Sequence, residues 1–212
     1  YYKKIFPVFA QKAKHIITVS EFSKQDIHET YKVPLDKITV AYNGASDLFK
    51  PIAEDEKKTI REQFTAGTDY LVYVGALHKR KNIVRMLDAF DQQKILHPSD
   101  LKFVIVGEKL FKSPEIDVAF EKMKHPSDVI FTGRLPQAKL VKVIAAAKGM
   151  VYVSYFEGFG IPVLEAMKCG VPVLTSNVTS LPEVGGDRAI YCDPMNTESI
   201  TNGINELVNT TF

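Results

Sequence analysis

The sequence predicts an α/β protein built on a doubly wound parallel sheet, and two observations support this prediction. Short runs of β-branched and aromatic residues alternate along the 212 residues with amphipathic stretches and short loops, as right-handed βαβ crossovers require. The strand-like runs are continuously apolar, whereas a strand with one face in water would alternate polar and apolar residues. We therefore expect the strands to be covered by helices on both faces.

The expected elements follow one another in a regular order. Strand-like runs lie at residues 15–20, 37–44, 70–75, 101–107, 129–133, 150–154, 171–176 and 189–194. Helical spacing is found at residues 21–31, 82–94, 114–124, 136–147 and 197–208. Three strands end in Gly75, Gly107 and Gly133. Ligands of such sheets bind at the carboxyl ends of the strands, so we expect the site along this edge.

A boundary is expected in the polar segment 43–58, which contains Gly44 and Pro51 and has no hydrophobic periodicity. It is predicted to be a linker between an N-terminal piece, residues 1–45, and a main domain, residues 46–212.

Composition excludes several functional classes. The net charge of +2 is too small to indicate a nucleic-acid partner. No apolar run approaches the roughly 20 residues that span a bilayer. Cys169 and Cys192 do not have metal-ligand spacing. We expect free thiols in a reducing cytoplasm, and therefore a cytoplasmic protein.

The segment "YFEGFGIPVLEAMKCG", residues 155–170, joins a glycine turn to a helix. Gly158 and Gly160 let the backbone approach a ligand closely, and Pro162 suits the first helical turn. The N–H groups and dipole at the start of this helix can bind an anion such as a diphosphate.

Two acids flank this helix start. Glu157 precedes the glycines and can accept hydrogen bonds from sugar hydroxyls. Glu165 lies one turn into the helix, where its carboxylate can hold the two adjacent hydroxyls of a ribose. The alternative is that Glu157 only complements the helix dipole and that Glu165 faces water.

A basic loop follows the strand that ends at Gly75. In "VGALHKRKNI", residues 74–83, Arg80 and Lys81 can clamp phosphate, the first through a forked guanidinium and the second as a point charge. The alternative is a solvated basic loop. His78 has no assigned role.

Two further turns are weaker signals. In "FTGRLPQAKL", Arg134 and Leu135 follow a strand, at a turn that can present backbone groups to a planar base. The segment "SLPEVGG", residues 180–186, fits a helical turn closed by glycines as well as it fits a ligand contact.

Taken together and in this order, the segments resemble the retaining GT-B glycosyltransferases of family four. "EGFGIPVLEAMKCGVPVLTS" looks like that family's signature, in which seven residues separate two acids, and "SLPEV" follows at the expected distance. The preceding matching blocks are "IITVSEFSKQDI", "ITVAYNGASDLFKP", "YVGALHKRKNI", "FVIVGE" and "FTGRLPQAKL". The resemblance covers nearly the whole chain.

The resemblance implies a Rossmann-like domain that binds a nucleotide-diphosphate sugar, with no cofactor and no metal, and transfers the sugar with retention at the anomeric carbon. Glu157 and Lys81 would be catalytic, the first at the donor sugar and the second at the departing diphosphate. The resemblance assigns the remaining donor-binding positions to Arg80 beside the diphosphate, Arg134 and Leu135 near the base, the backbone of Gly158, Phe159, Gly160 and Ile161 at the sugar and diphosphate, and Glu165 at the ribose. Many family members carry an arginine where this chain has Ala76, and Arg80 would replace it.

The resemblance also implies a fragment. Residues 1–45 would be a remnant of an acceptor-side domain, and residues 46–212 a donor-side domain truncated at its C-terminal end. A glycan or lipid-linked acceptor would bind through the missing domain, so these residues alone would be inactive. A peripheral contact of the longer protein with the inner face of a membrane stays open. Two alternatives also remain, a non-catalytic nucleotide-sugar-binding module and a nucleotide-sugar epimerase of the same fold.

Overall fold

The computed structural model describes residues 2–108 and 114–210, and its centre is a parallel sheet. Its strands are β3 (Tyr70–Val74), β4 (Lys102–Val106), β5 (Val129–Gly133), β6 (Gly149–Tyr152), β7 (Val173–Ser176) and β8 (Ala189–Cys192). They lie in the order β5-β4-β3-β6-β7-β8, and each described neighbour pair is parallel. The predicted fold class is confirmed.

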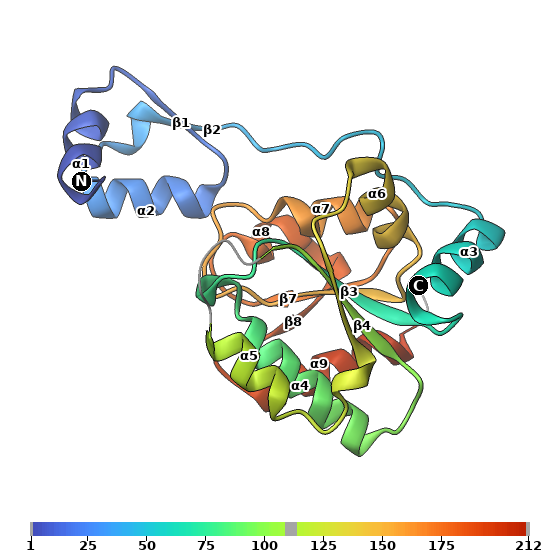
Figure 1. Cartoon of the computed structure of the whole chain (residues 1–212). Helices are drawn as coiled ribbons and strands as arrows, with labels where there is room; N and C mark the ends of the chain where they lie inside the picture. Colours follow the sequence, from blue (N-terminus) through green and yellow to red (C-terminus); the bar gives the residue numbers. More distant parts are fainter. Residues whose placement is uncertain (1, 109–113, 211–212) are drawn as a thin grey trace.

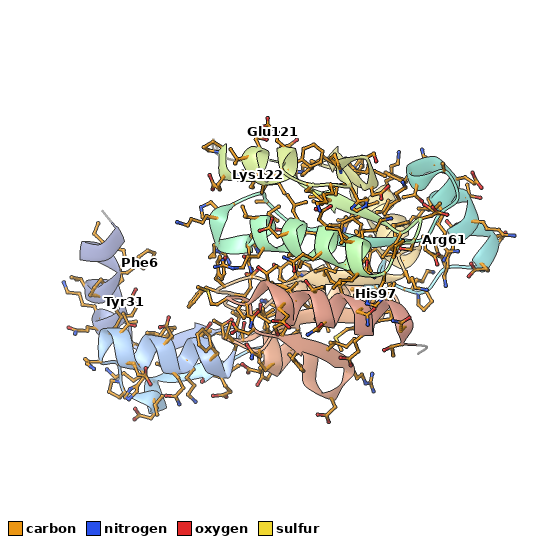
Figure 2. All side chains as sticks on the ribbon, turned by 90° about the horizontal axis from the view of Figure 1, so that it is seen from below. Phe6, Tyr31, Arg61, His97, Glu121 and Lys122 are labelled. Atoms are coloured by element: carbon orange, nitrogen blue, oxygen red, sulfur yellow. The ribbon has the colours of Figure 1, made fainter. Side chains whose placement is uncertain are left out.

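Helices cover both faces of this sheet (Figure 1). One face carries α4 (Ile83–Leu96), α5 (Pro114–Glu121) and α9 (Thr197–Asn209), and the other carries α6 (Gln137–Ala145), α7 (Ile161–Lys168) and α8 (Leu181–Gly185). Seen from below, α4 and α9 lie side by side (Figure 2), and they are in contact along their length. Short 3-10 turns occur at η2 (Lys79–Lys81), η3 (Pro126–Asp128) and η4 (Gly186–Arg188).

The core lies where the central strands meet these two layers. Residues 70–73 of β3 and residues 149–152 of β6 are buried, as the continuous apolar runs predict. Even the polar end of a core tyrosine is paired, since the Tyr70 hydroxyl donates to the carbonyl of Val143 at 2.7 Å. Buried polar groups without such partners would oppose folding.

The winding of the sheet reverses between its two central strands. From β3 the chain moves outward through β4 to β5, and from β6 it moves outward the other way through β7 to β8. The loops that follow β3 and β6 therefore diverge over opposite faces. A crevice at the carboxyl ends of these two strands is where open α/β sheets bind ligands.

A smaller N-terminal unit stands to one side of the main sheet (Figure 1). It contains α1 (Tyr2–Lys12), β1 (Ile16–Thr18), α2 (Glu21–Tyr31), η1 (Leu35–Lys37) and β2 (Ile38–Val40), with β1 and β2 paired in parallel. Both strands are shorter than expected. The expectation that both faces are covered is wrong for this pair, since α2 packs against it yet Ile17 stays 73% exposed.

The predicted linker is partly helical. All of residues 41–53 are described, and they form neither helix nor strand. At Glu54, however, α3 (Glu54–Thr65) begins inside the segment expected to be a linker. Three acids in its first turn favour the helix N-terminus, and Ile60 and Phe64 pack on the core. These are the only two large apolar residues of α3, which are too few to show a helical periodicity in the sequence.

Candidate functional site

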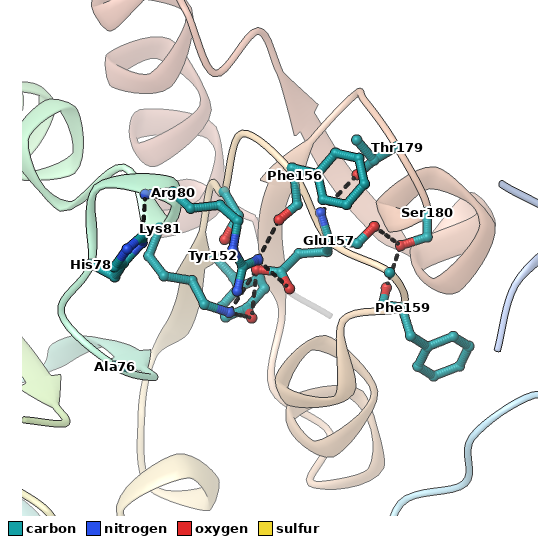
Figure 3. Close-up of polar contacts among 12 residues, drawn as sticks. Ala76, His78, Arg80, Lys81, Tyr152, Phe156, Glu157, Phe159, Thr179 and Ser180 are labelled. Carbon is teal, nitrogen blue, oxygen red and sulfur yellow. Dashed lines mark hydrogen bonds and ion pairs between the residues drawn. The ribbon is translucent and has the colours of Figure 1, made fainter. Parts of the chain in front are cut away.

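A buried ion pair joins the two loops of the crevice (Figure 3). Lys81 lies in η2 after β3, Glu157 follows β6, and Lys81 Nζ lies 2.6 Å from Glu157 Oε1. The hydroxyl of Tyr152, at the end of β6, accepts from Lys81 at 2.7 Å and donates to Glu157 at 3.1 Å. The three side chains form one connected polar group.

Arg80 adds a second cation to this group. One of its guanidinium nitrogens lies 2.9 Å from Glu157 Oε2 and also donates to the carbonyl of Phe156. The backbone of Arg80 is held as well, because its carbonyl accepts from the N–H of Tyr155 at 3.0 Å and its N–H donates to the His78 ring at 3.1 Å. We call Arg80, Lys81, Tyr152 and Glu157 the ionic cluster.

The carboxylate of this cluster stays ionised although it is buried. Glu157 is only 7% exposed, and burial by itself raises the pKa of a carboxyl group. The hydrogen bonds and charges of Lys81 and Arg80 outweigh burial and hold the pKa of Glu157 below its usual range. The site therefore holds two cations around one anion.

The glycine turn beside the cluster is fixed by hydroxyl groups. Ser180 Oγ donates to the carbonyls of Glu157 and Phe159, at 2.9 Å in each case. Gly160 has φ 111°, and a Cβ there would lie 2.7 Å from Leu181, so only glycine fits. The helix α7 then begins at Ile161, with Pro162 in its first turn as predicted and no side chain capping its N-terminus.

A cavity of about 530 Å³ lies at the same carboxyl edge of the sheet as the cluster, and no residue of the cluster lines it. Its wall includes Arg134, Leu135 and Glu165, together with Gln137 and Phe49. Burial raises the pKa of Glu165. Gly75 and Gly107, which follow β3 and β4, also line the cavity, and their backbones lie so close together that a Cβ on Gly107 would lie 1.8 Å from the carbonyl oxygen of Gly75.

The structure sorts the predicted residues into two adjacent groups. Arg80, Lys81 and Glu157 meet in the ionic cluster, whereas Arg134, Leu135 and Glu165 line the cavity. The backbone of residues 158–161 follows directly on Glu157. Ala76 also lines the cavity. That Arg80 replaces the arginine which many family members carry at this position stays a prediction. Glu165 is half-buried in the cavity wall, and its role at the ribose stays a prediction, as does the alternative that it faces only water.

Several residues of the site were not predicted. Tyr152 ends an apolar strand, and a hydroxyl at the carboxyl end of a buried run is the signal that could have singled it out. Phe49 comes from the linker, and nothing in its neighbourhood indicates a cavity wall. Asn82 stands at the N-cap position of α4, where an asparagine side chain commonly caps the helix, but here its side chain donates to the carbonyl of Pro194 at 2.8 Å.

The described residues were also compared with what a metal site and a pair of reactive thiols require. Within residues 2–108 and 114–210, no three His, Cys, Asp or Glu side chains are grouped so that they could hold a metal ion. Metal independence stays a prediction. Cys169 and Cys192 are free and buried, and burial raises their pKa values to about 11 and about 12. None of the described helices has the length and apolar character needed to cross a membrane.

Models of two glycosyltransferase families match this chain. The glycosyl transferases group 1 model matches residues 55–211, and the glycosyltransferase family 4 model matches residues 1–47. O-antigen chain mannosyltransferase B of Escherichia coli is 33% identical over 202 residues, which are 95% of this chain and 53% of that protein. O-antigen chain mannosyltransferase RfbU of Salmonella typhimurium is 28% identical over 98% of this chain and 54% of its own length. The chain spans about half the length of these relatives.

Two solved structures illustrate how closely known proteins share this fold. Anabaena Alr3699/HepE in complex with UDP-glucose superposes with a TM-score of 0.86 at 21% identity, over 97% of this chain and 57% of that chain. WaaG, a glycosyltransferase involved in lipopolysaccharide biosynthesis, superposes with a TM-score of 0.79 at 19% identity, over 92% and 53%. At these identities the likeness concerns the fold.

Proposed function

Because this chain belongs to the glycosyl transferases group 1 family, we propose that it binds a nucleotide-diphosphate sugar in the crevice between β3 and β6. The sugar is then transferred with retention to a glycan or a lipid-linked acceptor. The transfer is proposed for the whole protein, because the relatives are about twice as long as this chain.

The ionic cluster is the observation that supports this proposal most strongly. Two cations and a glycine turn lie beside a cavity large enough for part of a nucleotide. A diphosphate leaving group gains negative charge as the glycosidic bond breaks. Preorganised cations and backbone N–H groups stabilise that stage most, because they already point at the developing charge.

Each side chain then has a distinct part in the proposal. Lys81 and Arg80 neutralise the diphosphate, and Glu157 accepts hydrogen bonds from the hydroxyls of the sugar. Glu165, from its place in the cavity wall, holds the ribose hydroxyls, and Arg134 with Leu135 lies against the base. Burial raises the pKa of Glu165 because its carboxylate has lost hydrating water. The hydroxyl groups of a ribose would replace this water as hydrogen-bond donors.

The names of relatives suggest which donors to test first. Two relatives are named O-antigen mannosyltransferases, and one structural neighbour is in complex with UDP-glucose. We therefore propose a hexose donor and place mannose first, with UDP, GDP and ADP as the nucleotides to compare.

Titration calorimetry of the 212-residue chain with these nucleotides and their sugars tests the proposal. Binding of at least one diphosphate, retained when EDTA is present, is the expected result. A folded chain that binds none of them at millimolar concentration would refute it. Product analysis with the longer protein separates the alternatives, because an epimerase changes the sugar without an acceptor and a binding module leaves the donor intact.

A further inference from the structure

The first turn of α2 lies against the loop that carries Glu157. The Phe22 ring packs edge-on against Phe156, with ring centres 5.6 Å apart. The same turn of α2 also contacts α8, because the N–H groups of Glu21 and Phe22 donate to the Glu183 carboxylate at 2.7 and 3.2 Å. The N-terminal unit is thus tied to the main unit on both sides of the glycine turn.

Between these two contacts, the turn itself is held by two serines. Ser20 Oγ and Ser23 Oγ both donate to the carbonyl oxygen of Gly158, at 2.7 and 3.0 Å. A carbonyl oxygen has two lone pairs, so this one is fully engaged. Ser20 is fully buried and also caps α2 by accepting from the N–H of Ser23 at 3.0 Å.

This double contact fixes the plane of the peptide that joins Gly158 to Phe159. Peptide bonds are planar, and every described one is trans, so the N–H of Phe159 points away from the Gly158 carbonyl and from α2. The carbonyls of Glu157 and Phe159, on either side of it, share the single hydroxyl proton of Ser180. Among the residues that the structure describes, none accepts a hydrogen bond from the N–H groups of residues 158–160.

We propose that Ser20 and Ser23 are positioning residues, which set the Gly158–Phe159 peptide so that its N–H donates to the sugar or diphosphate of the donor. This inference rests on the proposed function. It gives the N-terminal unit a part in donor binding: two hydroxyls more than 130 residues away in sequence orient a backbone donor. A glycine turn without such restraint would lose binding energy in becoming ordered.

Ser23→Ala is the cleanest test, because it removes one of the two hydroxyls and leaves the Ser20 cap in place. Nuclear magnetic resonance of the ligand-free chain reports the Phe159 amide signal, and calorimetry reports the affinities for a nucleoside and for its diphosphate sugar. Ser23→Thr keeps a hydroxyl and is the rescue variant. Glu183→Ala loosens the same interface without touching Gly158 and is the matched control.

In Ser23→Ala the Phe159 amide signal should move, and affinity for the diphosphate sugar should fall by about 2- to 12-fold, the range of one neutral hydrogen bond. Nucleoside affinity should not change, and Ser23→Thr should behave as the wild type. The same selective loss in Glu183→Ala would overturn the inference in favour of general docking.

The two proposals fail differently. If the Phe159 amide signal does not move in Ser23→Ala, the positioning role of the serines is overturned, while the proposed nucleotide binding still stands. A wild-type chain that binds no nucleotide, although the signal responds, would overturn the proposed function and with it the role in donor binding.

Discussion

Lys81→Ala removes the group that joins the two loops of the crevice. Its side chain is 12% exposed and contacts Glu157 at 2.6 Å and Tyr152 at 2.7 Å. After the substitution, Glu157 still accepts from Tyr152 at 3.1 Å and pairs with Arg80 at 2.9 Å. The loss should therefore stay below the roughly 3–5 kcal/mol of a buried charge left alone.

One charge-assisted hydrogen bond contributes about 1.5–3 kcal/mol, so the free energy of unfolding should fall by that amount. For a domain of this size the thermal midpoint should drop by roughly 3–12 °C. In binding, the same range corresponds to a loss of about 10- to 150-fold in diphosphate affinity. Nucleoside affinity should be unchanged, because Lys81 does not line the cavity.

Calorimetric titration with a nucleoside and its diphosphate measures the two affinities, with Lys79→Ala as the control. Lys79 is an exposed cation of the same turn, and its loss should change neither affinity. The double variant Lys81→Ala/Glu157→Gln should not recover diphosphate binding, because the cation that holds the phosphate is still missing. Equal losses for both ligands in Lys81→Ala would refute the phosphate role.

Four other substitutions give independent checks. Glu165→Gln should weaken a nucleoside and its diphosphate by the same factor, about tenfold, because it lines the cavity assigned to the ribose; titrations showing a loss for the diphosphate alone would contradict this. Tyr152→Phe removes a buried hydroxyl that bonds two charged groups, so chemical denaturation should show a loss of about 1–2 kcal/mol, and an unchanged value would mean that these bonds add nothing net. Glu157→Gln should flatten the acid side of the stability profile, measured from about pH 6 to pH 3. The folded-state pKa of Glu157 lies below its unfolded value, so its contribution is present above the unfolded pKa and is lost as the pH falls through the folded one; parallel profiles would count against this. Gly107→Ala should cost about 3 kcal/mol or more, because a Cβ would lie 1.8 Å from a backbone carbonyl oxygen at the end of β3, whereas Gly44→Ala meets nothing within 4 Å and should fold normally.

Local sequence patterns were sufficient for most of the elements. The apolar runs of β3 and β4 are unbroken and end in glycine, so both their burial and their carboxyl ends could be predicted. Pro162 marked the first turn of α7 because proline lacks the N–H that a helix interior needs. In each case the information lies within a few residues of the element.

Where the local signal was weak or misleading, prediction failed. The helix α3 begins inside a polar segment, and its buried side carries few apolar residues. Asn82 has the sequence of a helix cap, yet it adopts a left-handed conformation and bonds a carbonyl 112 residues away. A nearby sequence cannot show that a distant carbonyl competes for the same side chain.

What the sequence by itself determined is the inventory of elements and the chemical groups at their ends, because periodicity, glycine and proline act over a single turn or strand. Tertiary structure alone decided which of these groups meet. Lys81 and Glu157 are 76 residues apart, and Ser20 and Gly158 are 138 apart. The first pair meets because β3 and β6 lie side by side at the reversal of the sheet, and the second because α2 docks on the glycine turn. Strand order and docking follow from how whole layers bury their apolar faces together, which no short segment of the chain encodes.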